Sequence, residues 1–251
     1  CKYITTPCPW DEASTSRPVG DYDYGHMQSY IEHRYGMTVN KNKLVDAVGN
    51  VCTTNARNPL TEWLDSLVWD GEERAWSVLP TFLGAEATDY VSECTRVWML
   101  AAVARAYEPG TKFDAMLVLA GPQGIGKSSM ARLFAMSDEW YLDNLNTVEV
   151  KEAAEKIRGM WVCEMAELLA TKRMKDIEAV KAFVSSQADT IRPAYARETE
   201  RRPRTCVFIG TTNSESFLTD KTGNRRYMTV TCGVNEPVMS PINPGERERS
   251  F

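Results

Sequence analysis

The sequence lacks three features that mark particular protein classes. Its apolar runs fall short of the roughly 18 to 20 residues that a membrane-spanning helix needs, and we expect no signal peptide. Its cysteines are never spaced as a zinc-binding pair. It has no excess of positive charge, because its formal net charge is −5. These absences argue against a membrane protein, a zinc-binding domain and a protein coated in positive charge.

The cysteines are odd in number and scattered along the chain. They are Cys1, Cys8, Cys52, Cys94, Cys163, Cys206 and Cys232. Two of them, Cys163 and Cys206, lie inside apolar runs that are typical of strands. We therefore expect reduced, buried cysteines in a protein of the cytoplasm.

The chain is long enough for one large α/β domain, or for a smaller core domain with a helical domain. It has 251 residues, and an apolar fraction of 43% predicts a sizeable core. Residues 1–26 show little periodicity and are predicted to form a poorly ordered or extended arm. Residues 27–110 favour a small helical domain, in which Thr88 to Tyr107 has the clearest helical spacing.

From residue 111 the pattern changes to strands that alternate with helices. Continuous apolar runs predict buried strands, and helical segments lie between them. The expected strands are 115–120, 160–164, 204–213 and 226–231, and the expected helices are 128–136, 150–158 and 176–186. This alternation predicts an α/β core over residues 111–232, with a mostly parallel sheet between flanking helices. Residues 233–251 are predicted to be an irregular tail.

A glycine-rich loop follows the first of these strands and matches the pattern G-x-x-x-x-G-K-[ST]. It reads Gly121, Pro122, Gln123, Gly124, Ile125, Gly126, Lys127 and Ser128, and Ser129 follows. Glycines let backbone N–H groups approach phosphate oxygens, and the next helix points its positive end at the same place. The loop predicts a P-loop that binds ATP, with Lys127 on the β- and γ-phosphates and Ser128 on Mg²⁺.

Further polar residues lie where buried strands are expected to end. Glu164 and Glu167 are candidates for holding Mg²⁺ and for polarising the attacking water, and the sequence does not decide between them. Glu164 is assigned to the metal together with Ser128. Asn213 is expected to face the γ-phosphate. Arg225 and Arg226 are either a solvated corner or arginine fingers, which often come from a neighbouring subunit.

Basic residues outnumber acidic ones between Lys172 and Arg204, although the whole chain is acidic. Pro193 and Tyr195 interrupt this stretch, which predicts a hairpin. Such charge can follow a nucleic-acid backbone, or it can form a mixed-charge solvated surface. The candidate nucleic-acid contacts are Lys181, Arg192, Arg197, Arg201, Arg202 and Arg204.

Taken together, these motifs resemble the virulence-associated protein E-like family of phage and mobile-element ATPases. That family is similar to superfamily 3 helicases of the AAA+ class. The resemblance runs from about Met27 to Val230. It rests on Leu64-Asp-Ser-Leu-Val-Trp-Asp-Gly71, Leu119 to Ser128, Trp161-Val-Cys-Glu-Met-Ala-Glu-Leu168, Asp189-x-x-Arg192-Pro-x-Tyr195, Gly210-Thr-Thr-Asn213 and Thr222-Gly-Asn-Arg-Arg226.

The resemblance implies a role for each candidate. Glu164 and Glu167 become the Walker B acids, Asn213 becomes sensor 1, and Arg225 or Arg226 becomes the finger. The segment from Lys181 to Tyr195 falls where the related helicases carry a DNA-contacting hairpin. A homo-oligomer is implied, with a hexamer as one option, together with single-stranded or forked DNA as partner. The implied location is the bacterial cytoplasm.

Two functions from different classes remain open at this point. The first is an ATP-hydrolysing, ring-forming helicase or translocase in the replication of a phage or mobile element. The second is an ATP-dependent DNA-binding loader, regulator or defence module that does not unwind DNA. A metabolic kinase is a weaker third reading, because it does not explain Gly210-Thr-Thr-Asn213 followed by two adjacent arginines.

Overall fold

In the computed structural model the chain divides into two units, Cys1–Ser66 and Leu67–Phe251. Residues 3–4, 7–11, 17–166, 174–192, 198–213 and 224–237 are described. The division falls earlier than the expected boundary at residue 110, because the long helix Asp89–Tyr107 contacts the sheet of the second unit. No helix among these residues is long and apolar enough to cross a membrane.

The described residues of the first unit form three helices and a short pair of antiparallel strands. The helices are α1 (Asp21–Tyr35), α2 (Lys41–Thr54) and α3 (Pro59–Ser66), and β1 (Tyr3–Ile4) pairs antiparallel with β2 (Arg17–Pro18). The Asn40 side chain caps α2 by accepting a hydrogen bond from the backbone of Asn42 at 2.9 Å. Helix α1 begins at Asp21, earlier than the expected start at Met27.

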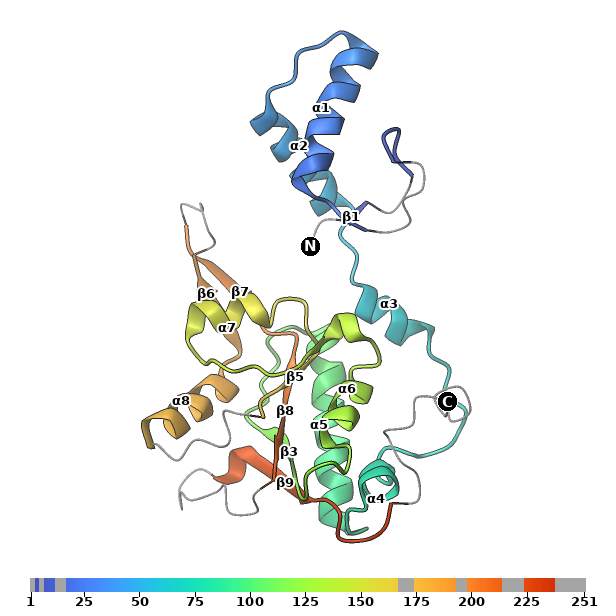
Figure 1. Ribbon diagram of the computed structural model, residues 1–251, viewed down its shortest axis with the longest axis vertical. Coiled ribbons are helices and arrows are strands. Elements are labelled where there is room, and N and C mark those ends of the chain that lie inside the picture. Colours follow the sequence, from blue (N-terminus) through green and yellow to red (C-terminus); the bar gives the residue numbers. More distant parts are fainter. Residues whose placement is uncertain are drawn as a thin grey trace. The chain divides into compact units, whose positions relative to one another are not determined.

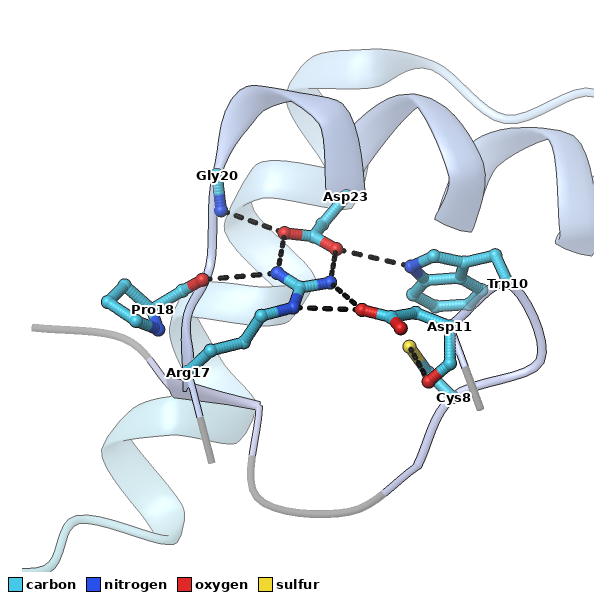
Figure 2. A network of polar contacts seen from close by, with 7 residues as sticks. All are labelled: Cys8, Trp10, Asp11, Arg17, Pro18, Gly20 and Asp23. Atoms are coloured by element: carbon cyan, nitrogen blue, oxygen red, sulfur yellow. Dashed lines mark hydrogen bonds and ion pairs between the residues drawn. The ribbon is translucent and has the colours of Figure 1, made fainter. Parts of the chain in front are cut away.

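A polar network accounts for the early start of α1 (Figure 2). The Asp23 carboxylate, in the first turn, accepts a hydrogen bond from the backbone N–H of Gly20 at 2.9 Å. Arg17 donates to both Asp23 oxygens at 2.7 Å and to Asp11 at 3.0 Å, and Trp10 donates its indole N–H to Asp23. Hydrogen bonds therefore join the described part of residues 1–26 to helix α1. The sequence predicted a poorly ordered or extended arm for these residues.

The second unit is built on a five-stranded parallel sheet (Figure 1). Its strands are β4 (Tyr141–Leu142), β5 (Val162–Glu164), β8 (Val207–Thr212), β3 (Met116–Ala120) and β9 (Tyr227–Thr231), in that spatial order. All four neighbouring pairs are parallel. The predicted α/β layout with a parallel sheet is confirmed, and the short edge strand β4 was not anticipated.

Helices cover both faces of this sheet. On one face lie α5 (Asp89–Tyr107) and α6 (Lys127–Phe134), which meet through the tilted rings of Trp98 and Phe134 at 5.2 Å. On the other face lie α7 (Val150–Lys156) and α8 (Met174–Ser185). They share one buried core with alternate residues of β3, Met116 and Val118. Cover by helices on both faces explains why all five residues of β3 are buried.

Helix α5 is joined to the sheet by hydrogen bonds as well as by packing. The Trp98 indole donates to the backbone oxygen of Phe208 at 2.8 Å, and Arg105 donates to that of Cys206 at 2.7 Å. From the sheet side, Trp161 donates to the backbone oxygen of Ala102 at 2.8 Å. A short helix, α4 (Val78–Leu83), precedes α5. The helix that the sequence placed in a separate domain is thus part of the sheet's own unit.

The predicted hairpin is present as β6 (Ala188–Ile191) and β7 (Glu200–Pro203), which pair antiparallel. Its base is held by Arg204, whose guanidinium donates to both carboxylate oxygens of Asp189 at 2.8 and 2.6 Å. Both side chains are buried, at 1% and 6% exposure. The residues between the strands, 193–197, lie outside the described part of the chain.

Candidate functional site

The glycine-rich loop lies between the carboxyl end of β3 and the start of α6, as the sequence predicts. Gly126, which precedes α6, has φ of +93°, a left-handed backbone that favours glycine. At Gly121 a Cβ atom would lie 2.4 Å from the backbone oxygen of Cys232, so the approach of the chain after β9 requires glycine. Both features hold the loop around the amino end of a helix, where anions are favoured.

Lys127 lies inside this loop, and only 7% of it is exposed. Its Nζ donates to the backbone oxygens of Gly121 at 2.8 Å and Pro122 at 2.6 Å. It also donates to Oδ1 of Asn213, at the carboxyl end of β8, at 3.0 Å. Burial lowers the pKa of Lys127. Two residues that are far apart in the sequence therefore meet at one point.

Glu164 ends β5 and lies on the other side of the same site, with 3% of its surface exposed. Its Oε1 accepts hydrogen bonds from the Ser128 hydroxyl at 2.7 Å and from the Thr211 hydroxyl at 2.6 Å. Its Oε2 accepts a hydrogen bond from the Tyr141 hydroxyl. Three hydroxyl groups from β4, α6 and β8 thus fix both oxygens of one buried carboxylate.

Tyr141 was missed by sequence reasoning. It lies on the two-residue edge strand β4, which is too short to show periodicity. Burial raises the pKa of the Tyr141 hydroxyl, and the hydrogen bond to Glu164 acts in the same direction, so the group remains a protonated donor. Thr211 was also unassigned, although it stands inside the polar strand end Gly210-Thr-Thr-Asn213.

Ser128 and Glu164 offer the two kinds of oxygen that a hard cation takes, a hydroxyl and a carboxylate. Within the described ranges, no group of three or more His, Cys, Asp and Glu residues is placed to hold an ion. Such a sparse donor set fits Mg²⁺, which keeps several waters and takes one or two protein oxygens together with phosphate. Glu167, the other candidate acid, lies outside the described residues.

The arginine pair is separated from this site by the length of the sheet. Asn224–Arg226 forms a 3-10 turn directly before β9. Because Tyr227 pairs with Met116 at the start of β3, the turn lies at the amino edge of the sheet, whereas the loop follows its carboxyl edge. Arg225 is exposed, and Arg226 donates to the Ser185 hydroxyl at 2.8 Å. The two arginines are thus not equivalent.

The six candidate nucleic-acid residues are divided by burial. Arg192 and Arg201 are exposed on the β6–β7 hairpin, and Arg202 is half-buried beside Glu200. Arg197 lies outside the described residues. Two others differ from the prediction because their charges face inward, Lys181 at 4% exposure beside Glu178 and Arg204 in its pair with Asp189.

Comparisons with known proteins give one family and a set of distant structures. The model of the virulence-associated protein E-like domain matches residues 64–249. None of the curated proteins matches. An apo structure of the NrS-1 C-terminal region (305–718), in its A form, has 16% sequence identity and a TM-score of 0.44; the match covers 68% of this chain and 39% of that one. A second apo structure of the same region has 16% sequence identity and a TM-score of 0.44, and the match covers 66% of this chain and 39% of that one. The chain spans about two fifths of those structures.

Proposed function

The chain belongs to the virulence-associated protein E-like domain family, and from this premise we propose that it is a P-loop ATPase that binds ATP with Mg²⁺. The observation that carries the proposal is the convergence at the carboxyl edge of the sheet. Lys127 meets Asn213 there, and Ser128 meets Glu164, beside a loop that is built for phosphate. We further propose that the protein works as a ring-forming helicase or translocase in the replication of a phage or mobile element.

Phosphate binding follows from the loop. Lys127 now donates to two backbone oxygens of the loop and to Asn213. A phosphate group at the amino end of α6 would offer stronger, charged acceptors, so the ammonium group would exchange its carbonyl partners for phosphate oxygens. Asn213 would then be free to orient water or to contact the γ-phosphate. The loop residues from Gly121 to Ser129 form the proposed ATP site.

We propose different tasks for the two acids. Both oxygens of Glu164 are already directed, one of them toward Ser128. Such a fixed carboxylate suits the metal site, where Ser128 and Glu164 would hold Mg²⁺ and the ion would neutralise charge on the phosphates. Glu167 is then the residue that we assign to the attacking water.

Position supports a neighbouring subunit as the source of the arginine finger. Arg225 and Arg226 lie at the amino ends of the strands, whereas the loop of their own subunit lies at the carboxyl ends. Because Arg226 is engaged with Ser185 whereas Arg225 is exposed, we assign the finger to Arg225. A guanidinium placed against the transferring phosphoryl group stabilises the charge of the transition state. Hydrolysis therefore requires a homo-oligomer, with a hexameric ring as one arrangement.

The nucleic-acid surface is proposed to be smaller than the sequence indicated. Arg192, Arg201 and Arg202 lie on the β6–β7 hairpin with exposed or half-exposed side chains. They would contact the backbone of single-stranded or forked DNA, and such binding weakens steeply as salt increases. Arg204 would support the hairpin through its pair with Asp189, and Lys181, paired with Glu178 on α8, is left out of the proposed surface.

Replacement of Lys127 by alanine tests the ATPase proposal. The variant should lose ATP hydrolysis by a factor of about 100 or more, because a charged contact to the reacting phosphates is removed. Lys112→Ala is the matched control, since Lys112 is 70% exposed and pairs at the surface with Asp114. Turnover should be measured as phosphate release, with and without single-stranded DNA.

The outcomes separate the two functions. Equal turnover in Lys127→Ala and in the wild-type protein would contradict the P-loop assignment. ATP binding by the wild-type protein without turnover, at any DNA concentration, would favour the loader or regulatory module instead. Stimulation of turnover by single-stranded DNA would support the translocase.

A further inference from the structure

We propose that Tyr141 is a positioning residue that orients the Glu164 carboxylate toward Ser128 and thereby sets the affinity of the site for its divalent cation. The inference rests on the proposed function of the site. It adds a residue from the edge of the sheet to a site whose other members lie on β5, β8 and α6. Tyr141 acts through Glu164 and is not itself a catalytic residue.

The hydrogen bonds around Glu164 carry the inference. The two donors on Oε1, Ser128 and Thr211, leave the carboxylate able to pivot about that oxygen. The Tyr141 hydroxyl is the donor that the described residues supply to Oε2. With both oxygens engaged, the plane of the carboxylate is fixed, and Oε1 remains directed at Ser128. A hydroxyl group that ligates a cation can still donate its hydrogen to this oxygen.

A simpler reading is that Glu164 merely satisfies a half-buried phenol. The sheet register argues for more, because Tyr141 pairs with Val162, and residues 162 and 164 of β5 face the same side of the sheet. The two-residue strand β4 thereby places the Tyr141 hydroxyl within hydrogen-bond reach of Glu164. Groups that orient a metal ligand usually change metal affinity by about 10- to 100-fold when they are removed. The two readings therefore predict different affinities of the site for a divalent cation, and this affinity can be measured directly.

The experiment compares Tyr141→Phe with the wild-type protein in the full chain. Mn²⁺ serves as the probe, and its binding is followed by electron paramagnetic resonance in the presence of a non-hydrolysable ATP analogue. We expect the affinity for Mn²⁺ to fall by about tenfold. The Mg²⁺ concentration for half-maximal ATP hydrolysis should rise by a similar factor, while kcat at saturating Mg²⁺ changes by less than about threefold. This split between affinity and kcat is the signature of positioning.

Two further variants calibrate the result. Tyr35→Phe removes the same hydroxyl from an exposed tyrosine of the first unit, which is 64% exposed, and should leave every value unchanged. Thr211→Val removes one of two donors to Oε1, so its effect on Mn²⁺ affinity should be smaller than that of Tyr141→Phe. Thermal unfolding of each variant shows whether the fold is retained.

The outcomes distinguish this inference from the function on which it rests. Unchanged Mn²⁺ affinity and an unchanged Mg²⁺ requirement in Tyr141→Phe, with normal turnover, would overturn the positioning role and leave the ATPase intact. A folded Tyr141→Phe whose kcat falls while Mn²⁺ affinity is kept would also overturn it. If the wild-type protein binds no Mn²⁺ with the analogue and hydrolyses no ATP, the proposed function itself fails, and the inference fails with it.

Discussion

Burial decides what each arginine of the basic stretch does. Arg204 lies against the neighbouring rings of Phe183 and Phe208, with its guanidinium carbon 4.1 and 5.6 Å from the ring centroids. It also donates to the backbone oxygen of Phe183 and to Asp189. Arg202, only two residues earlier, pairs with Glu200 at the surface of the hairpin. An arginine is therefore part of the buried core at position 204 and part of the hairpin surface at position 202.

Replacement of Arg204 by alanine should destabilise the second unit by about 3 to 5 kcal/mol, because Asp189 would be left buried without its partner. Arg202→Ala should cost at most about 1 kcal/mol, as is usual for an exposed pair. Unfolding in urea, followed by fluorescence of the tryptophans, measures both. Equal and small effects of the two changes would contradict a structural role for Arg204.

At the scale of elements, the start of α1 depends on one ion-paired carboxylate. The Arg17 guanidinium, which hydrogen-bonds both oxygens, holds the pKa of Asp23 well below its usual range. A carboxyl group with a lowered pKa in the folded state adds stability above its unfolded pKa, about 4. That contribution is lost as the pH falls below this value. The contacts between hairpin, loop and helix therefore weaken in acid.

Amide hydrogen exchange of α1, corrected for intrinsic rates, tests this dependence in the full chain. Protection of residues 21–35 in the wild-type protein should decrease as the pH falls from 5 through about 4 toward 3. Asp23→Asn should show lower protection at pH 7 and a flatter dependence on pH. Asp46→Asn changes an exposed carboxylate on α2 and serves as control. If Asp23→Asn follows the wild-type curve, the network does not hold the helix.

At the scale of the whole molecule, the parallel sheet places the proposed ATP site and the proposed arginine finger at opposite ends of its strands. Every strand runs in the same direction, so the residues after β3, β5 and β8 gather at one edge, and the turn before β9 lies at the other. Heterologous contacts between copies, of the kind that close into rings, can bring one edge against the other. The topology thus favours a site completed by a second copy.

Mixing two inactive variants tests this arrangement. Lys127→Ala and Arg225→Ala should each be inactive alone, because one lacks the proposed phosphate contact and the other lacks the proposed finger. In a randomly mixed ring, roughly one interface in four joins an intact Lys127 to an intact Arg225, so a corresponding part of the activity should return. Phosphate release after mixing measures the recovered activity. Inactivity of the mixture, with mixed oligomers shown by mass, would place the finger elsewhere.

Much of the molecule follows from local pattern. The apolar run before the glycine-rich loop, the helix from Thr88 to Tyr107 and the polar strand end at Asn213 all occur where the sequence predicts them. Apolar periodicity and glycine spacing are local properties, so they can be read without knowledge of the fold. The roles of ATP and Mg²⁺ remain predictions from the same motifs.

Only the tertiary structure decided which side chains meet. No pattern links Tyr141 to Glu164, because a two-residue strand has no period and its place beside β5 depends on the order of strands in the sheet. Nor does composition separate Arg204 from Arg202, since charge is a property of the residue whereas burial depends on its neighbours. The sequence by itself determined the elements and the candidate chemistry. Packing decided that both oxygens of Glu164 are engaged, that Arg225 is exposed whereas Arg226 contacts Ser185, and that Arg204 is part of the core.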